Sequence, residues 1–365
     1  MRILIAGGGT GGHVYPGIAI AKELKSADQN VEVLFVGTAQ GLENKIVPKE
    51  GFKLKTIRSK GINRNSVVDN IKTLNTNVAG LKDAKAIVKD FKPDIAIGTG
   101  GYVTGPVILV CALSKVRTII HESNVIPGVA NKILSRFVDY IAISYKDTKK
   151  YFKVADSKIK VTGNPVRKDL FLYKKFQSKY ALGFDTQKPL IVSVGGSRGA
   201  QNINAAILNY INEFLPSSIQ FLFITGENQY DKIMGKLDMT KHKNLKVVPF
   251  SYKMPQVYAA SDLIICRAGA MTISEVSASG VPSILIPSPY VAENHQEYNA
   301  RALKRAGSAK IILEKNLNED VLKTNINELI YDKNKLNDMS EKAKMMSKPD
   351  AVDEIVRLIN KLVEC

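Results

Sequence analysis

The glycine-rich segment near the amino terminus has the clearest chemical meaning in this chain. A short apolar run, residues 3–6, leads into Gly7-Gly8-Gly9-Thr10-Gly11-Gly12 and then into His13. A buried strand that turns through glycines into a helix presents backbone N–H groups there, and the missing side chains let a pyrophosphate approach closely. The glycines also satisfy the dinucleotide spacing G-x-G-x-x-G, which is a weak signal by itself. The segment predicts an anion-binding turn.

A nicotinamide dinucleotide would need one more feature, an acidic residue at the end of the second strand to bind the ribose. The predicted second strand, residues 31–36, ends in Gly37-Thr38, and its only acid, Glu32, lies at its beginning. A nicotinamide oxidoreductase therefore becomes the least favoured of the functions considered.

A second candidate site lies in residues 262–275, which read as a strand, a turn of small residues and a helix. The first amides of that helix, at Ala270, Met271 and Thr272, suit anionic or carbonyl oxygens. The carboxylate of Glu275 can accept two hydroxyl hydrogen bonds, as a ribose diol would supply. The alternative is that Glu275 only complements the helix dipole, and spacing does not decide between the two.

Other polar motifs also follow predicted strands. His121-Glu122-Ser123-Asn124 comes after an apolar strand, although a lone histidine there is more often structural than catalytic. Arg167, in the segment 163–167, lies at a domain junction where it can reach a phosphate, and residues 287–296 form a polar loop suited to sugar hydroxyls. Neither a nucleophile elbow nor a metal-binding spacing is present, so we predict no metal site and no cofactor.

Composition narrows the class of partner. The 365 residues carry 52 Lys and Arg against 34 Asp and Glu, a formal net charge of +18, which favours anionic partners unless it only reflects a basic proteome. The chain has no Trp and no basic block interleaved with aromatics, which argues against nucleic acid. Three distant cysteines fit a reducing cytosol. The longest apolar stretch, residues 107–113, is far shorter than a membrane span, so we expect a soluble protein or one at a membrane surface.

Strand patterns alternate with helical patterns along the chain, which predicts an α/β protein with parallel sheets covered by helices. A second strand that leads into glycines, at residues 189–199, indicates two doubly wound domains facing each other across a cleft, at 1–163 and 164–348. Residues from 349 onward follow helical spacing and predict an amphipathic helix that packs on one of the domains. The predicted strands are 2–6, 31–36, 94–98, 117–121, 139–144, 189–194, 219–225, 245–249, 262–266 and 282–287.

Seven segments, taken in order, resemble the MurG family of peptidoglycan synthesis from residue 2 to the region of residue 307: GGGTGGHVYPG, GTGGYVTGP, HESN, GNPVR, GGSRGAQ, RAGAMTISE and ENHQEYNA. The resemblance implies a GT-B fold in which two Rossmann-like domains hold a sugar nucleotide in the cleft between them. It also implies that the terminal helix, 349–365, joins the domain at 1–163. The implied reaction moves N-acetylglucosamine from UDP-N-acetylglucosamine to the C4 hydroxyl of undecaprenyl-diphospho-muramoyl-pentapeptide (lipid I), which gives lipid II. The implied role is in cell-wall synthesis, and through it in cell shape and division.

The resemblance also assigns site residues. In the second domain it implies that UDP-N-acetylglucosamine is bound by Ala270, Met271, Thr272 and Glu275 at the uridine, Phe250 at the base, Ser197 and Arg167 at the diphosphate, and Gln296 at the sugar. In the first domain it implies donor contacts from Thr10, Gly11, Gly12 and Asn124, and acceptor-side roles for His13 and Tyr102. The family often has paired glutamines where this chain has His295-Gln296, which leaves the role of His295 open.

An α-linked donor and a β-linked product imply one inverting displacement, which needs a base at the acceptor hydroxyl and stabilisation of the departing diphosphate. We take His13 as the candidate base and Glu122 as the alternative; His13 could instead orient the acceptor diphosphate. Competing functions are other GT-B enzymes on the same donor, a 2-epimerase or a lipid A disaccharide synthase.

The lipid-linked acceptor implies docking at the cytoplasmic face of the membrane, on anionic lipid and beside other cell-wall synthesis proteins. Residues 67–89 carry an apolar stripe edged by lysines, which suits such a surface. An ordinary core-facing stripe is the alternative. We predict that vesicle binding weakens when Ile71, Leu74 and Lys82 are replaced by Ser. The stripe consists of Val67, Ile71, Leu74, Val78, Leu81 and Val88, with Lys72, Lys82, Lys85 and Lys89 beside it.

Overall fold

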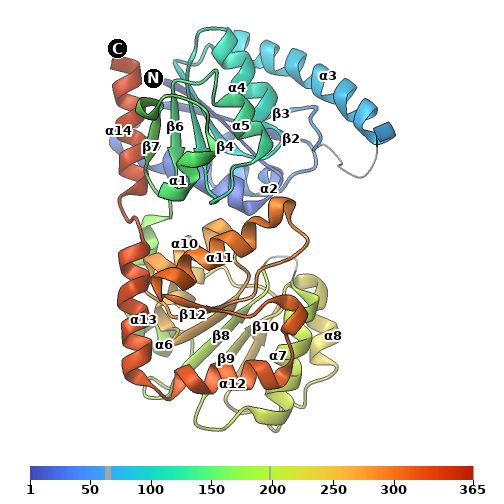
Figure 1. Ribbon diagram of the computed structural model, residues 1–365, viewed down its shortest axis with the longest axis vertical. Helices are drawn as coiled ribbons and strands as arrows, with labels where there is room; N and C mark the ends of the chain where they lie inside the picture. Colours follow the sequence, from blue (N-terminus) through green and yellow to red (C-terminus); the bar gives the residue numbers. More distant parts are fainter. Residues whose placement is uncertain (62–66, 197–198, 365) are drawn as a thin grey trace. The chain divides into compact units, whose positions relative to one another are not determined.

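The computed structural model describes residues 1–61, 67–196 and 199–364, and within its third helix the side chains of 67–72 and 74 also lie outside the description. The chain forms two compact units (Figure 1). Unit 1 comprises Met1–Val166 together with the segment from Lys348 to the carboxyl terminus, and unit 2 comprises Arg167–Ser347. The chain leaves unit 1 three residues later than the sequence indicated.

Within the described residues, unit 1 is built on a seven-stranded sheet in the order β3-β2-β1-β4-β5-β6-β7, and every pairing in it is parallel. Its strands are β1 (Arg2–Gly7), β2 (Glu32–Thr38), β3 (Lys53–Ile57), β4 (Ile95–Gly100), β5 (Arg117–Glu122), β6 (Tyr140–Ile143) and β7 (Ile159–Val161). Its helices are α1 (Gly11–Ala27), α2 (Glu43–Lys49), α3 (Val67–Phe91), α4 (Thr104–Leu113), α5 (Val129–Leu134) and α14 (Ala351–Glu364), with 3₁₀ turns at Lys146–Tyr151 and Asp156–Lys158.

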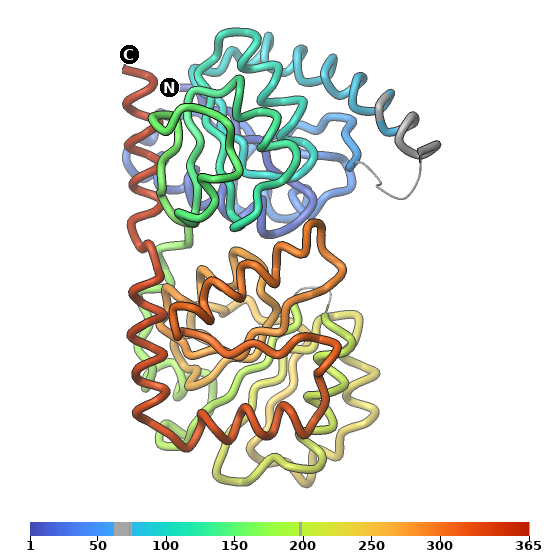
Figure 2. Tube along the Cα trace, viewed as in Figure 1, coloured from blue at the N-terminus to red at the C-terminus, as the bar shows by residue number. Residues whose placement is uncertain are grey.

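The central strands of unit 1 are continuously apolar because helices cover both faces of the sheet. Successive residues of β1 alternate between two cores: Leu4 packs with the residues beneath α3 and α4, whereas Ile3 and Ile5 pack beneath α1 and α14. The terminal helix contributes Ile355 and Ile359 to the second core and lies beside α1 (Figure 2). The last segment of the chain is therefore part of the unit that the first segment begins.

Unit 2 repeats this plan with a six-stranded parallel sheet, counted over the described residues, in the order β10-β9-β8-β11-β12-β13. Its strands are β8 (Leu190–Val194), β9 (Gln220–Ile224), β10 (Leu245–Val248), β11 (Leu263–Cys266), β12 (Ser283–Leu285) and β13 (Ala309–Ile311). Its helices are α6 (Lys175–Ala181), α7 (Gln201–Phe214), α8 (Tyr230–Met234), α9 (Met254–Ala260), α10 (Ala270–Ala278), α11 (His295–Ala306), α12 (Glu319–Ile330) and α13 (Lys333–Met346), with 3₁₀ turns at Lys168–Phe171, Glu227–Gln229, Ala292–Asn294 and Glu314–Asn316.

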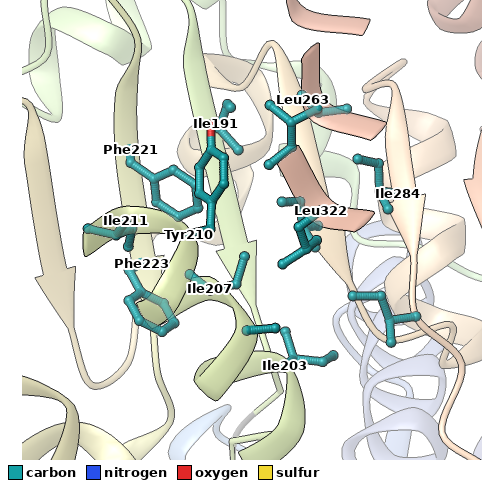
Figure 3. Packing of buried hydrophobic residues seen from close by; sticks show 14 of the residues in the cluster. Ile191, Ile203, Ile207, Tyr210, Ile211, Phe221, Phe223, Leu263, Ile284 and Leu322 are labelled. Carbon is teal, nitrogen blue, oxygen red and sulfur yellow. The ribbon is translucent and has the colours of Figure 1, made fainter. Parts of the chain in front are cut away.

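The core of unit 2 lies between the sheet and helices α7 and α12 (Figure 3). Tyr210 of α7 is almost fully buried against Phe221 of β9, with ring centroids 6.2 Å apart. Leu322 of α12 and Leu263 of β11 close the other side of this cluster. Apolar side chains of α7 and α12 thus pack against the sheet and hold in place the strands whose ends carry the polar motifs.

Three strands that the sequence analysis did not predict, β3, β7 and β13, each lie at an edge of a sheet. Their sequences, KLKTI, IKV and AKI, are short and carry lysines. Lysine on an edge strand discourages pairing with the strands of other chains. Because lysine also interrupts the run of apolar residues by which interior strands are recognised in a sequence, these strands were not predicted.

Both units place their strand-order reversal between the first and the fourth strand, at β1/β4 in unit 1 and at β8/β11 in unit 2. In open α/β sheets, ligands bind beyond the carboxyl ends of the strands at this switch point. No helix within the described residues is long and apolar enough to span a membrane.

Candidate active site

In unit 1, the turn from β1 into α1 brings His13 back onto the backbone of the glycine-rich loop. His13 Nδ1 lies 3.1 Å from the carbonyl oxygen of Gly8 and 3.2 Å from the hydroxyl of Thr10. A carbonyl only accepts, so the Gly8 contact assigns the Nδ1 proton as its donor, and the lone pair of the neutral ring then lies on Nε2. That tautomer is the one a general base at Nε2 requires.

The turn after β4 supports the other side of the same ring. Gly100 and Gly101 have φ of 116° and 84°, and a Cβ at Gly100 would lie 2.5 Å from Cδ2 of His13. Larger residues would therefore displace the ring. Tyr102, 40% exposed, follows this turn, and its ring faces Gly9, where a Cβ would lie 3.3 Å from Cε1. The sheet order thus brings Thr10, His13 and Tyr102 together.

Glu122 occupies a different environment at the end of β5. Its side chain is buried and accepts four hydrogen bonds: from the amide and side chain of Asn124 at 3.0 and 3.2 Å, from the Gly128 amide at 2.9 Å, and from the Asn131 side chain at 2.8 Å. These contacts occupy the acceptor positions of a carboxylate. The geometry fits Glu122 as an anchor of the 123–131 loop better than as the alternative base, and it presents Asn124 at the strand edge.

His121 is also structural in this arrangement. It is buried, and burial lowers its pKa to about 4, so the ring is neutral near neutral pH. Its Nε2 lies 3.0 Å from the Gly163 carbonyl, while the Asn164 side chain donates to the Ser123 carbonyl at 3.1 Å. The motifs HESN and GNPVR are thereby joined, which explains why the chain leaves unit 1 only after Val166.

In unit 2, Glu275 lies in the second turn of α10. Its Oε2 accepts the hydroxyl of buried Tyr258 at 3.1 Å. Burial raises the pKa of the Glu275 carboxyl to about 7, against the opposing positive charge of Arg167. Burial, together with Glu275, also raises the pKa of Tyr258 well above its usual value. A partly exposed carboxyl whose pKa burial raises and the charge of Arg167 lowers, at a switch point, is typical of a ligand site.

The first turn of α10 presents Ala270, Met271 and Thr272, the residues predicted to meet uridine. Gly269 is the N-cap residue and makes no side-chain cap, and the side chains of Ala270 and Met271 are buried. The backbone, rather than these side chains, is therefore what this turn can offer an oxygen atom. Arg167, the first residue of unit 2, lies 3.0 Å from Asp169 through its Nε.

The remaining predicted donor residues occupy other strand ends of unit 2. Gln296, in the first turn of α11, accepts the Ser288 amide at 2.9 Å and so fixes the loop after β12. His295 Nδ1 lies 2.8 Å from the Ala292 carbonyl, and the two preceding residues, Glu293 and Asn294, have positive φ. Phe250 follows β10 and packs against Tyr252. Ser197 lies outside the described residues.

The lysine-edged stripe on α3 is only partly available as a surface. Leu81 and Val88 pack into the core of unit 1, so the expectation of an apolar ridge is wrong at these two positions. Val78 and Lys82 are exposed. The side chains of Ile71 and Leu74 lie outside the described residues.

Two residues that organise these sites lie outside every sequence motif described above. Tyr258 carries no motif, and only its contact with Glu275 reveals it. Glu43, at the start of α2, is completely buried and binds the amides of Gly9 and Thr38, each at 2.8 Å. Because this carboxylate faces inward, it does not offer the ribose contact that a nicotinamide site would need.

Two segments of the chain match known protein families. Residues 3–143 match the N-terminal domain of glycosyltransferase family 28, and residues 190–355 match its C-terminal domain. The chain is thus a glycosyltransferase with the GT-B fold.

Relatives narrow the class. A UDP-N-acetylglucosamine--N-acetylmuramyl-(pentapeptide) pyrophosphoryl-undecaprenol N-acetylglucosamine transferase from Caldanaerobacter subterraneus subsp. tengcongensis is 50% identical over 362 residues, which cover 98% of this chain and 99% of the relative. The crystal structure of MurG from Acinetobacter baumannii aligns with a TM-score of 0.79 and 29% identity over 99% of both chains. The chain belongs to the MurG family.

A 2-epimerase is similar in fold only. The UDP-N-acetylglucosamine 2-epimerase from Neisseria meningitidis, solved with UDP-N-acetylglucosamine, aligns with a TM-score of 0.70 but 16% identity, over 99% of this chain and 100% of that one.

Proposed function

We propose that this protein transfers N-acetylglucosamine from UDP-N-acetylglucosamine to the C4 hydroxyl of the muramoyl residue of lipid I, which yields lipid II. The observation that carries the proposal is membership of the MurG family along nearly the whole chain. Both switch points also present side chains of the required kind: an imidazole in unit 1, and in unit 2 a carboxyl whose pKa the charge of Arg167 lowers.

We assign donor binding to unit 2. The ribose hydroxyls donate to Glu275, whose carboxyl Tyr258 holds in place. The first amides of α10 meet the uridine and the diphosphate, and Arg167 adds a positive charge. Gln296 meets the sugar from the first turn of α11, and Phe250 lies beside the base.

We assign the acceptor to unit 1. His13 Nε2 takes the proton of the C4 hydroxyl while that oxygen forms its bond to the anomeric carbon. The bond from the anomeric carbon to UDP breaks in the same step, and UDP leaves with the electron pair. A single displacement inverts the anomeric centre, as an α-linked donor and a β-linked product require. Tyr102, beside the glycine-rich loop, bounds the acceptor position, and Glu122 keeps the Asn124 loop in place.

We place the membrane contact of this reaction on unit 1 as well. Helices α3, α4 and α5 are neighbours there, and they or the residues that follow them expose Val78, Leu113, Ile133 and Phe137. Lys115, Lys132 and Arg136 lie in the same segments, and Lys82 is exposed on α3. Apolar side chains edged by basic residues suit an anionic lipid surface, where each basic residue adds about 1 kcal/mol. The apolar part of this surface differs from the stripe predicted on α3, because Leu81 and Val88 belong to the core.

The test is incubation of the full chain with labelled UDP-N-acetylglucosamine and lipid I in detergent, followed by separation of the lipid products. We expect labelled lipid II. A parallel reaction without lipid I distinguishes the alternatives, because an epimerase converts the free sugar nucleotide to its 2-epimer. Label in a product made without lipid I, and none in lipid II, would contradict the proposal.

A further inference from the structure

The side chain of Glu43 lies against three glycines, one in the glycine-rich loop and two near the end of β2. A Cβ added at Gly8, Gly37 or Gly41 would lie 2.4, 2.4 and 2.0 Å from an atom of the Glu43 side chain. No side chain fits at such separations. These three glycines therefore enclose a carboxylate of the protein itself.

The hydrogen bonds of this carboxylate divide between two segments. Oε1 accepts the amide and the hydroxyl of Thr38, at 2.8 and 3.0 Å, and Oε2 accepts the amide of Gly9 at 2.8 Å. The side chain has no exposed surface. A buried acceptor shared in this way ties the end of β2 to the glycine-rich loop, and removing one partner from such a group is costly.

The loop that Glu43 holds is the one that positions His13. Gly9, whose amide Glu43 accepts, directly follows Gly8, whose carbonyl oxygen contacts Nδ1 of His13. The Gly8 amide in turn donates to Gly100 at 3.3 Å, on the turn that supports the other side of the ring. The orientation of the imidazole therefore depends on a backbone segment that is also held by the Glu43 carboxylate, 34 residues after Gly9.

We propose that Glu43 is a positioning residue: its buried carboxylate fixes the glycine-rich loop and, through Gly8, the ring of His13. The kinetic part of this inference rests on the function proposed above, whereas the effect on the His13 ring does not. Glu43 itself touches no substrate in this scheme.

The decisive variant is Glu43→Gln, which keeps the size of the side chain but has one acceptor oxygen. Thr38 offers two donors and Gly9 offers one, so the amide oxygen turns to Thr38 and the amide NH₂ group faces the Gly9 N–H. The two N–H groups then face each other. The hydrogen bond to Gly9, in the loop that contacts His13, is lost, whereas those to Thr38 are kept.

Asp139→Asn is the matched control. Asp139 Oδ2 also accepts the amide and hydroxyl of a threonine, Thr118, at 2.7 and 3.2 Å, but at the amino end of β5, opposite the strand ends that carry the site. A merely structural role for Glu43 predicts that the two variants behave alike.

The measurements use the full-length chain: kcat and KM for lipid II formation, calorimetric binding of UDP, thermal unfolding, and the ring proton signals of the four histidines. For Glu43→Gln we expect kcat to fall by about tenfold to a hundredfold, with UDP affinity within about twofold of the parent and a changed His13 signal. For Asp139→Asn we expect a lower unfolding midpoint, with kcat and the His13 signal unchanged.

An unaltered kcat and His13 signal in Glu43→Gln would overturn the inference, as would an equal loss of kcat in Asp139→Asn. If Glu43→Gln does not fold, Gly41→Ala serves instead, because its Cβ would crowd Oε2. A Gly41→Ala variant with the parent His13 signal would then be the contrary result. If the parent protein makes no lipid II, the proposed function fails, but the His13 signal still decides this inference.

Discussion

The two switch points have the same topology but different chemistry. In unit 1, the loop after β1 directs one of its amides inward to a buried carboxylate and presents a histidine. In unit 2, the turn after β11 leads into α10 with no side-chain cap. The carboxyl of Glu275 on that helix accepts a tyrosine hydroxyl and feels the positive charge of Arg167. One doubly wound sheet order can therefore hold a reacting base or bind a nucleotide, depending on which side chains follow its first and fourth strands.

His13→Ala is expected to have the largest effect, a loss of turnover without a loss of UDP binding. Losing a general base typically lowers kcat by about 10²–10⁴-fold, whereas UDP binding, assigned to unit 2, should stay close to that of the parent. Steady-state kinetics with lipid I and calorimetry with UDP measure the two effects. His242→Ala, which changes a histidine outside both sites, is the control. Turnover equal to that of the parent in His13→Ala would show that His13 is not the general base.

Glu275→Ala should produce the opposite pattern. We expect UDP binding to weaken by about 2–3 kcal/mol, the value of a hydrogen bond to a charged group, with a matching rise in KM for the donor. Calorimetry on the folded variant provides the measurement, and thermal unfolding verifies the fold. Unchanged UDP affinity would mean that the carboxyl of α10 does not meet the ribose.

The exposed apolar side chains of unit 1 and unit 2 are expected to differ in their contribution to membrane binding. Replacing Leu113 and Ile133 together with Ser should weaken binding to anionic vesicles by about tenfold or more, at about 1 kcal/mol for each partly buried side chain. Added salt should weaken the binding of the parent. The matched control in unit 2 is Leu172→Ser with Phe176→Ser, since both residues are also exposed there. If the control variant loses vesicle binding and the unit 1 variant does not, the membrane contact lies on unit 2.

The smallest expected effect is a dependence of UDP binding on pH. Burial raises the pKa of Glu275 to about 7, and ribose hydroxyls bind the ionised carboxylate better. UDP affinity should therefore rise as pH increases through about 7, by at most about tenfold per pH unit below it. The same shift stabilises the unliganded fold below the ordinary carboxyl pKa, and that contribution disappears as pH rises through about 7.

Glu275→Gln isolates this effect, because ionisation of the UDP phosphate is common to both proteins and only the difference between them reports the carboxyl. Tyr258→Phe removes a hydrogen bond that lowers the Glu275 pKa, so it should move the midpoint to higher pH. Equal pH profiles for the parent and Glu275→Gln would contradict the assignment.

The MurG family and the GT-B fold could be predicted from the sequence because the glycine-rich turns and the interior strands are local signals. The charged edge strands β3, β7 and β13 could not, since they are short and lack an apolar run. The contact of Glu43 with Gly9 could not either, because it joins residues 34 apart through the packing of α2 against the sheet. The stripe on α3 illustrates a further limit: periodicity identifies an apolar face but not whether that face meets the core or the solvent.

The terminal helix has a consequence for how the protein is made. Unit 2 is one uninterrupted stretch, Arg167–Ser347, and all of it precedes α14 along the chain, so it is synthesised before α14. Unit 1 begins with the first strand but needs Ile355 and Ile359 of α14 to complete the core beneath α1. Domains generally fold as units and in the order of their synthesis. Here the unit that begins first is completed last, and until then the surface beneath α1 that α14 will cover is open to chaperones or to the nascent chain itself.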